Sequence, residues 1–280
     1  MKTVIQGSYH PITIAVDNIA RIFTKMGFDI VDGPECEMEW YNFDALNVPR
    51  HHPSRDMQDT FFVKNITGIN PVGQEDKYVM RTHTSNMQIR SMREHMEKVK
   101  SQIDKLNKND IDFKIKEKEL MDKSFPLAVV IPGKVYRNEA TDATHEAQFH
   151  QVEMLYVGRD ASMAMLKGIM QKFFSEFFAK ELKVRLRSSF FPFTEPSCEF
   201  DIECVHCAGA GCAVCKYVGW IEIGGAGLVH PNVLSAGNIP EGYRGIAFGC
   251  GIERMLMLKY AYDDVRLFYN GDLRVVKAMS

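Results

Sequence analysis

The chain has 280 residues, a length that allows one large domain or two smaller ones. Its 34 lysines and arginines are balanced by 36 aspartates and glutamates, which excludes a global positive field for nucleic acid and leaves such a role to a local patch or a partner chain. No apolar run approaches the ~20 residues of a membrane span, and residues 1–11 lack the apolar core of a secretory signal, so a cytoplasmic protein without membrane attachment is expected.

The first clear element is a helix from Pro11 to Met26. Its apolar residues recur at helical spacing, Pro11 suits the first turn, and Gly27 suits the position after the last one. Short apolar runs predict strands at 28–31, 78–81, 127–137, 148–157, 185–195, 218–223 and 243–248, a polar segment at 64–77 predicts a surface loop, and helical patterns return at 161–181 and 250–259. Strands follow one another with helices outside them, which predicts an α+β fold with an antiparallel sheet, in a single domain over residues 1–280.

A charged segment interrupts this pattern at about residues 91–123. Lysine, glutamate and aspartate dominate it, and its apolar residues form one narrow seam at spacings of four and three: Met92, Met96, Val99, Ile103 and Leu106. The seam predicts a helical insertion on the surface. Both a solvated helix face and a binding arm fit this pattern.

Two segments have the composition of a phosphate-binding site. No GxxxxGK[ST] loop or GxGxxG fingerprint is present, which excludes a P-loop and leaves a Rossmann site unsupported. Residues 249–254 instead bring glycine backbone and Arg254 to the start of a helix, where an anion is favoured. In the hairpin predicted at 127–157, Arg137 ends one strand, and Gln151 and Glu153 share a face of the other. An arginine facing an amide and a carboxylate can hold a phosphate at one end and an ammonium at the other.

These segments resemble a known family. Residues 27–34, Arg137 with the following hairpin, and residues 249–254 resemble motifs 1, 2 and 3 of class II aminoacyl-tRNA synthetases. Further stretches are similar to the alpha subunits of bacterial phenylalanine–tRNA ligases: YNFDALN at 41–47, RTHTS at 81–85, TDATHE and FHQVE within 141–153, and FPFTEPS at 191–197. The resemblance runs from about residue 7 to 273. It implies the class II synthetase fold, ATP-dependent activation of phenylalanine to an adenylate, and transfer to the 2′-hydroxyl of the terminal adenosine of tRNA(Phe).

The resemblance also implies roles for the matching residues. Arg137 would bind the α-phosphate of ATP and Arg254 the other end of the nucleotide, and the remaining ATP-binding residues would be His145, Glu146, Gly249 and Gly251. The ammonium and carboxylate of phenylalanine would be oriented by His83, Ser85, Gln151 and Glu153, and its ring would be enclosed by Phe191, Phe193, Thr194 and Ala247. Glu195 would ligate Mg²⁺.

Taken one at a time, several of these residues are better explained as ordinary structural residues than as parts of a site: Phe191, Phe193, Ala247, His83 and His145. The occurrence of all the motifs in order makes the site the better explanation. Two residues depart from the family pattern beside the implied site. Met154 stands where glycine is usual, and Asn86 where proline often follows the serine.

The resemblance further implies a partner. Family members act with a larger beta subunit, which carries editing and RNA-binding modules, in an (αβ)₂ heterotetramer. We therefore expect part of the surface near residues 11–34 to be apolar without that partner. The N-terminal helical arm with which family members grip tRNA is not present in this sequence, which does not distinguish a shortened chain from a naturally short one.

Four of the seven cysteines form the pattern Cys204-x2-Cys207-x4-Cys212-x2-Cys215. Two CxxC pairs with glycines between them can supply the four thiolates of a tetrahedral structural zinc, in a knuckle at 204–215. A reduced loop without metal is the alternative. Cysteine use of this kind indicates a reducing compartment. The other three cysteines are expected to be small buried groups: Cys36, Cys198 and Cys250.

Two other classes of function remain open from the sequence. A non-catalytic synthetase-like protein that binds an amino acid or regulates a partner would be favoured by loss of Arg137 or Arg254, and both are present. A zinc-dependent RNA-binding module is disfavoured because no basic patch accompanies the cysteines. Phenylalanine-dependent pyrophosphate exchange separates the enzyme from both.

Overall fold

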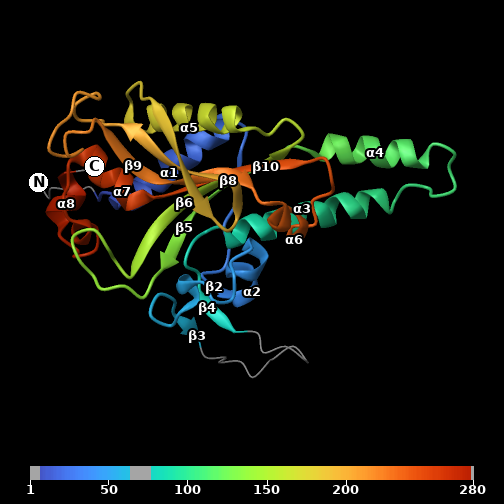
Figure 1. The fold of residues 1–280 in the computed structure, drawn as a ribbon, viewed down its shortest axis with the longest axis horizontal. Helices are drawn as coiled ribbons and strands as arrows, with labels where there is room; N and C mark the ends of the chain where they lie inside the picture. Colours follow the sequence, from blue (N-terminus) through green and yellow to red (C-terminus); the bar gives the residue numbers. More distant parts are fainter. Residues whose placement is uncertain (1–6, 64–76, 279–280) are drawn as a thin grey trace, which may run out of the picture.

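The computed structural model describes residues 7–63 and 77–278, so almost all of the polar segment expected as a loop at 64–77 lies outside the described residues. A seven-stranded sheet forms the body, in the order β1-β5-β6-β10-β9-β8-β7. Its described pairings are antiparallel except that of β1 with β5, which is parallel. Helices flank this sheet (Figure 1), so the α+β fold with an antiparallel sheet is confirmed.

The strands of the large sheet are β1 (Asp29–Ile30), β5 (Leu127–Tyr136), β6 (Gln148–Gly158), β7 (Val184–Phe191), β8 (Thr194–Glu203), β9 (Trp220–Val229) and β10 (Arg244–Gly251). A small sheet in the order β2-β4-β3 contains β2 (Cys36–Met38), β3 (Phe62–Val63) and β4 (Tyr78–Met80). The helices are α1 (Pro11–Lys25), α2 (Glu39–Asn42), α3 (Asn86–Ile103), α4 (Phe113–Ser124), α5 (Met163–Phe178), α6 (Pro231–Ala236), α7 (Ile252–Tyr260) and α8 (Leu273–Ala278), with 3₁₀ turns η1 (Asp44–Leu46), η2 (Pro53–Arg55) and η3 (Val265–Phe268).

Strand alternation divides the core into two layers. On one face of the sheet, Val152, Met154 and Phe248 pack with α1, α5 and α7 in the larger cluster of buried residues. On the other face, Leu155 and Ala247 belong to a second cluster with α3, α6 and residues 43–48. Because neighbouring residues of a strand point to opposite faces, Gln151 and Glu153 lie on the second face, away from the larger core. That face carries the pocket described below.

Helix α1 matches its sequence prediction, including Gly27 with a φ of +85° after its end. Its apolar residues, such as Ile19 and Phe23, are buried, and its outward side carries charged residues such as Asp17. The apolar surface expected near residues 11–34 is therefore largely limited to the neighbouring edge strand β1, where Ile30 is 41% exposed.

The charged insertion folds into two helices, α3 and α4, that project from the body as a hairpin (Figure 1). The predicted seam is buried at Met92 and Val99, near the body, and only half-buried at Ile103, where α3 ends. At the returning end, the Asp122 carboxylate accepts hydrogen bonds from Arg159 at 2.8 Å and Tyr243 at 2.7 Å. These bonds fix the base of the hairpin to the sheet.

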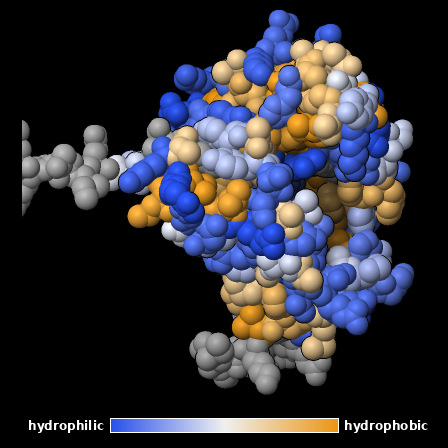
Figure 2. Space-filling model, turned by 90° about the vertical axis from the view of Figure 1, so that its left-hand side faces the viewer, coloured by the Kyte–Doolittle hydropathy of each residue, from blue (hydrophilic) through white to orange (hydrophobic). Residues whose placement is uncertain are grey.

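Hydrophilic residues cover most of the face in Figure 2, and hydrophobic residues show in patches between them and within a recess. Within residues 7–63 and 77–278, no helix is long and apolar enough to cross a membrane. Cys198 and Cys250 are buried as expected, but Cys36 is exposed. The expectation for Cys36 was wrong because β2 belongs to the small sheet and turns this side chain outward.

Candidate active site

A pocket of about 820 Å³ opens on the second face of the sheet. Strands β6, β8, β9 and β10 contribute to its lining, together with the segments around residues 43–59 and 82–88. The candidate residues that line it are His83, Ser85, Arg137, Gln151, Glu153, Phe191, Phe193, Thr194, Ala247, Gly249 and Gly251. Segments more than 150 residues apart thus meet in one cavity.

Backbone without side chains forms part of the pocket wall. Gly249 on β10 pairs with Glu153 on one side and Gly225 on the other. A Cβ at Gly249 would lie 2.8 Å from Cγ of Glu153, and one at Gly225 would lie 2.8 Å from the Phe191 ring. Glycine is required at both positions because these side chains lie directly against the strands.

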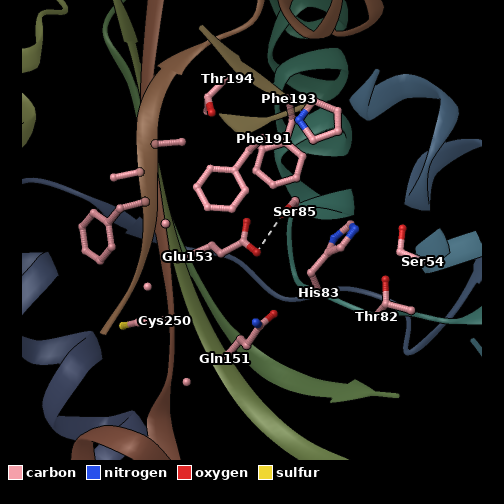
Figure 3. A pocket seen from close by; sticks show the side chains of 18 of the residues that line it. Ser54, Thr82, His83, Ser85, Gln151, Glu153, Phe191, Phe193, Thr194 and Cys250 are labelled. Atoms are coloured by element: carbon pink, nitrogen blue, oxygen red, sulfur yellow. Dashed lines mark hydrogen bonds between the residues drawn. The ribbon is translucent and has the colours of Figure 1, made fainter. Parts of the chain in front are cut away.

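Glu153 points from β6 into the space beside Phe191 and Phe193, and Gln151 points to the same side of the strand, further from the rings (Figure 3). The Glu153 carboxylate accepts hydrogen bonds from Ser85 Oγ and from Gln88, both at 2.7 Å. Burial nevertheless raises the pKa of Glu153 to about 7, because the cost of removing the charge from water outweighs these hydrogen bonds and the attraction of Arg81. Glu153 is therefore poised to gain from a bound cation.

Two open acceptors lie near this carboxylate. Among the described residues, His83 Nδ1 and Gln151 Oε1 are buried atoms without a hydrogen-bond partner. Burial and the nearby Arg137 guanidinium lower the pKa of His83 to about 3, so its ring is neutral. The Asn42 backbone opposes this shift only in part, and Nδ1, which has no partner, is open as an acceptor when the neutral ring carries its proton on Nε2.

The aromatic pair lies at the turn between β7 and β8. The rings of Phe191 and Phe193 stack with centroids 5.7 Å apart and an interplanar angle of 12°. Nδ2 of Asn47 donates to the Pro192 carbonyl at 2.7 Å, and Asn47 Oδ1 accepts from Asn232 at 2.9 Å. Asn47 therefore fixes the turn that presents both rings, a contact that sequence reasoning missed.

Arg137 directly follows β5, in the first strand of the hairpin that the sequence singled out as one of the two phosphate-type segments. Its Nε donates to the Thr82 carbonyl at 3.4 Å, and its guanidinium lies 5.0 Å from the centre of the Phe149 ring. Burial lowers the pKa of Arg137, but arginine starts so high that the group stays charged. The pocket thus has a cationic end at Arg137 and an anionic one at Glu153.

Four candidate residues are not among those that line the pocket. Arg254 is exposed on the first turn of α7, next to Gly251, while its neighbour Glu253 turns inward to His150. In the β5–β6 loop, His145 bonds to Asp142 and Glu146 accepts from Thr141. The Glu195 side chain is 71% exposed and lies 3.4 Å from His230.

Besides Asp59 and Glu139 in connecting segments, two carboxylates on strands line the pocket and were missed from the sequence, Glu199 on β8 and Glu222 on β9. Arg187 on β7 contacts both, at 3.0 Å and 2.7 Å, and also Asp201 at 2.9 Å. Alternation along β8 could have found Glu199, which follows Ser197 on the same face. No comparable signal marks Glu222.

The two departures from the family pattern point away from the pocket. Met154 is fully buried in the larger core with α1 and α5, on the opposite face of β6 from Glu153. Asn86 begins α3 and donates to Glu37 at 2.9 Å, alongside the Arg90 guanidinium. Neither side chain is among those that line the cavity.

The four clustered cysteines lie in the connection from β8 to β9. Their sulfur atoms all lie within 4.8 Å of one another, and Cys204 and Cys215 are buried. This arrangement could hold a metal ion.

Comparison with known proteins agrees with the pocket. The family model "tRNA synthetases class II core domain (F)" matches residues 1–112 and 113–279. Phenylalanine–tRNA ligase alpha subunits of Francisella tularensis subsp. novicida and Francisella philomiragia subsp. philomiragia are 46% and 45% identical over 273 residues, which cover 97% of this chain and 69% of each relative. The chain belongs to the phenylalanine–tRNA ligase alpha subunits, within the class II aminoacyl-tRNA synthetases.

Proposed function

We propose that the pocket joins L-phenylalanine to ATP as phenylalanyl-adenylate and that the amino acid then passes to the 2′-hydroxyl of the terminal adenosine of tRNA(Phe). The observation that carries this proposal is the grouping of Glu153, two open acceptors and a stacked aromatic pair in one cavity with Arg137. Phenylalanine-dependent ATP–pyrophosphate exchange tests it, and binding without exchange would favour the non-catalytic alternative.

The amino acid's ammonium fits the anionic end of the pocket. It has three N–H groups, and Glu153, Gln151 Oε1 and His83 Nδ1 offer three acceptors for them. Ser85 and Gln88 hold the Glu153 carboxylate in place for this contact. The phenyl ring would then lie with Phe191 and Phe193, beside Thr194 and Ala247, where aromatic contacts favour it.

Affinity for phenylalanine is expected to fall as the pH drops below about 7. Glu153 must be ionised to pair with the ammonium, and in the free pocket its pKa is about 7, so affinity is full above this pH and declines by up to about tenfold per pH unit below it. His83, with a pKa of about 3, does not titrate in this range. The measurement is the KM for phenylalanine in exchange assays at each pH. A Glu153→Gln variant should bind weakly and without this slope; a retained slope would assign it to another group.

ATP fits the opposite end. Synthetases of class II use ATP, and Arg137 would contact its α-phosphate, with Gly249 and Gly251 allowing close approach of the nucleotide. Arg254, His145 and Glu146 would have to turn toward the bound nucleotide from their exposed positions. These motions are part of the proposal.

Mg²⁺ bound with ATP would neutralise phosphate charge. Glu195 is the ligand that the family resemblance implies, and Glu199 and Glu222 are carboxylates that line the cavity itself. Carboxylate oxygens are the ligands that this hard cation prefers. Comparing the Mg²⁺ dependence of exchange in Glu195→Gln, Glu199→Gln and Glu222→Gln variants identifies which of them contribute.

The reaction needs no covalent enzyme intermediate. The phenylalanine carboxylate attacks the α-phosphorus, the bond to the β-phosphate oxygen breaks, and pyrophosphate leaves. Positioning of the two substrates and the fixed charge of Arg137 at the reacting phosphate lower the barrier. In the second step the terminal adenosine hydroxyl attacks the acyl carbon and AMP leaves.

Ala247→Gly is expected to widen the end of the side-chain pocket. Ala247 is buried, pairs with Gly227 and lines the cavity, so loss of its methyl group makes room for a para substituent. A change of this size is worth roughly 1–3 kcal/mol in discrimination. The measurement is the ratio of kcat/KM for phenylalanine and para-chlorophenylalanine. An unchanged ratio would contradict the assigned position of Ala247.

The complete enzyme is proposed to be an (αβ)₂ heterotetramer. The relatives are named alpha subunits, which supports a beta subunit as the partner and tRNA(Phe) as the second substrate. Residues 1–280 would be one catalytic domain, with the insertion at about 91–123 and the knuckle at 204–215 as additions. Its place of action would be the cytoplasm, where tRNA is charged for protein synthesis.

The four-cysteine knuckle is proposed to hold zinc. Four thiolates complete the tetrahedral coordination of this ion and leave no open position for substrate or water. The zinc would therefore be structural.

A further inference from the structure

Three of the six sulfur pairs in the knuckle have the spacing of a tetrahedral zinc site, and all four sulfurs lie within 4.8 Å of one another. Three sulfur pairs, Cys204–Cys212, Cys207–Cys215 and Cys212–Cys215, are each separated by 3.8 Å. A tetrahedral zinc with Zn–S bonds of about 2.3 Å places its sulfurs about 3.8 Å apart. A disulfide would need about 2.05 Å. The spacing therefore fits four thiolates around one ion and not two disulfides.

The backbone of the knuckle is arranged around these sulfurs. Amide groups of Gly211, Cys212 and Gly219 donate to Cys207 or Cys215 sulfur at 3.1 to 3.3 Å, and such bonds orient thiolates that bind a metal. Three non-glycine residues of the loop, Ala208, Lys216 and Tyr217, have φ of 46°, 50° and 64°. This left-handed conformation is unfavourable for them and persists only where other bonds enforce it.

The knuckle ends where the two strands that flank the pocket begin to pair. Cys204 follows the last residue of β8 and donates its amide to the Gly219 carbonyl at 2.9 Å, one residue before β9 starts. The β8–β9 register then shifts between Phe200 and Asp201, which pair with Gly224 and Glu222. Glu222 thus lies between the knuckle and this bulge. Because the pairing changes at the bulge, the β8–β9 pairs on the other side of it do not fix the register of Glu222.

We propose that the zinc knuckle is a positioning device for the adenylation reaction: by aligning β8 and β9 at their outer ends, the bound ion sets the place of the Glu222 carboxylate in the pocket. Arg187 on β7 links the aligned strands to this carboxylate, because it contacts Glu222 on β9 at 2.7 Å and Asp201 on β8 at 2.9 Å. The inference rests on the proposed function, since its effect appears at the end of the pocket assigned to ATP. The phenylalanine end is expected to be spared, because Glu153 and Ala247 lie on β6 and β10, and Thr194 lies at the opposite end of β8 from the knuckle, beyond a second register shift.

The experiment compares the complex of this chain with its beta subunit, as wild type and as the Cys207→Ser/Cys212→Ser variant. Wild type should contain one zinc per chain, and Co²⁺ in its place should give the absorption of a tetrahedral tetrathiolate centre. The variant should lose the zinc, melt at a lower temperature, and show a KM for ATP raised by up to roughly 100-fold with little change in the KM for phenylalanine. Cys36→Ser, at an exposed cysteine outside the cluster, is the matched control and should change none of these values.

Glu222→Gln separates positioning from simple stability. It should raise the KM for ATP while zinc content and melting temperature stay at wild-type values, and adding it to the cysteine variant should cause little further change. Fully additive effects, or a zinc-free protein with a normal KM for ATP, would overturn the proposal, as would a metal-free wild type. If the double cysteine variant does not fold, wild-type complex depleted with a chelator gives the same comparison. A complex with no exchange activity would refute the proposed function, while zinc content, the Co²⁺ spectrum and melting temperature would still decide the metal site.

Discussion

Replacing Arg137 with alanine is expected to lower phenylalanine-dependent ATP–pyrophosphate exchange by about 10²- to 10³-fold, the usual loss for one fixed group at a developing charge. Arg137 is the charged group that β5 brings to the pocket opposite Glu153, and it lies against Thr82 and Phe149. Because negative charge builds on the α-phosphate as the carboxylate attacks, the loss should appear mainly in kcat. Steady-state exchange kinetics with varied ATP measure it.

Two further variants sharpen this test. Arg137→Lys keeps a positive charge but not the planar pair of donors, so it should recover only part of the rate. Arg21→Ala removes an exposed arginine of α1 that contacts the neighbouring Asp17 and Asn18, and it should leave exchange unchanged. Full activity of Arg137→Ala would remove this residue from the mechanism.

The sequence predicted the parts of the site that depend on local periodicity. Alternation along the strand at 148–157 is sufficient to put Gln151 and Glu153 on one face, and the structure has them side by side on β6. The same rule explains why Met154 does not disturb the pocket, although its neighbour in the sequence is central to it. A two-residue period decides the side of a sheet without knowledge of the rest of the fold.

The residues that sequence reasoning missed depend on contacts between distant segments. The run at 185–195 was expected as one strand, but the chain reverses at Pro192 and continues as β8, and Asn47 holds this turn from 145 residues away. Glu222 reaches the pocket through a bulge in β9, and a bulge reverses the face that simple alternation assigns. Exposure could not be predicted for Cys36 either, since the small sheet that turns it outward joins three short strands from separate parts of the sequence.

The chain without its partner is expected to charge tRNA(Phe) poorly, and co-expression with the beta subunit should raise charging by roughly 10²-fold, because the RNA end must be positioned at the adenylate. Strand β1 supports this expectation. It is the end strand of the large sheet, both of its residues are exposed, and Ile30 presents apolar surface there. Light scattering of the purified complex should give a mass of four chains, and charging is measured with labelled phenylalanine.

A pair of substitutions tests where the partner binds. Ile30→Asp places a charge on the exposed edge and should weaken assembly and charging together, since burying an unpaired charge at an interface is costly. Ile111→Asp makes the same change at a fully exposed isoleucine in the connection between α3 and α4, the hairpin that projects from the body in Figure 1, and should leave both unchanged. The reverse result would make the helical hairpin the partner surface, and full charging by the isolated monomer would refute the partner requirement itself.

The aromatic pocket gives a second readout of the partner, because an apolar pocket rejects a substrate with an added hydroxyl by only about 10²-fold. Tyrosine should therefore be activated by the chain alone, and its stable transfer to tRNA should disappear once the beta subunit, for which the family resemblance implies an editing module, is present.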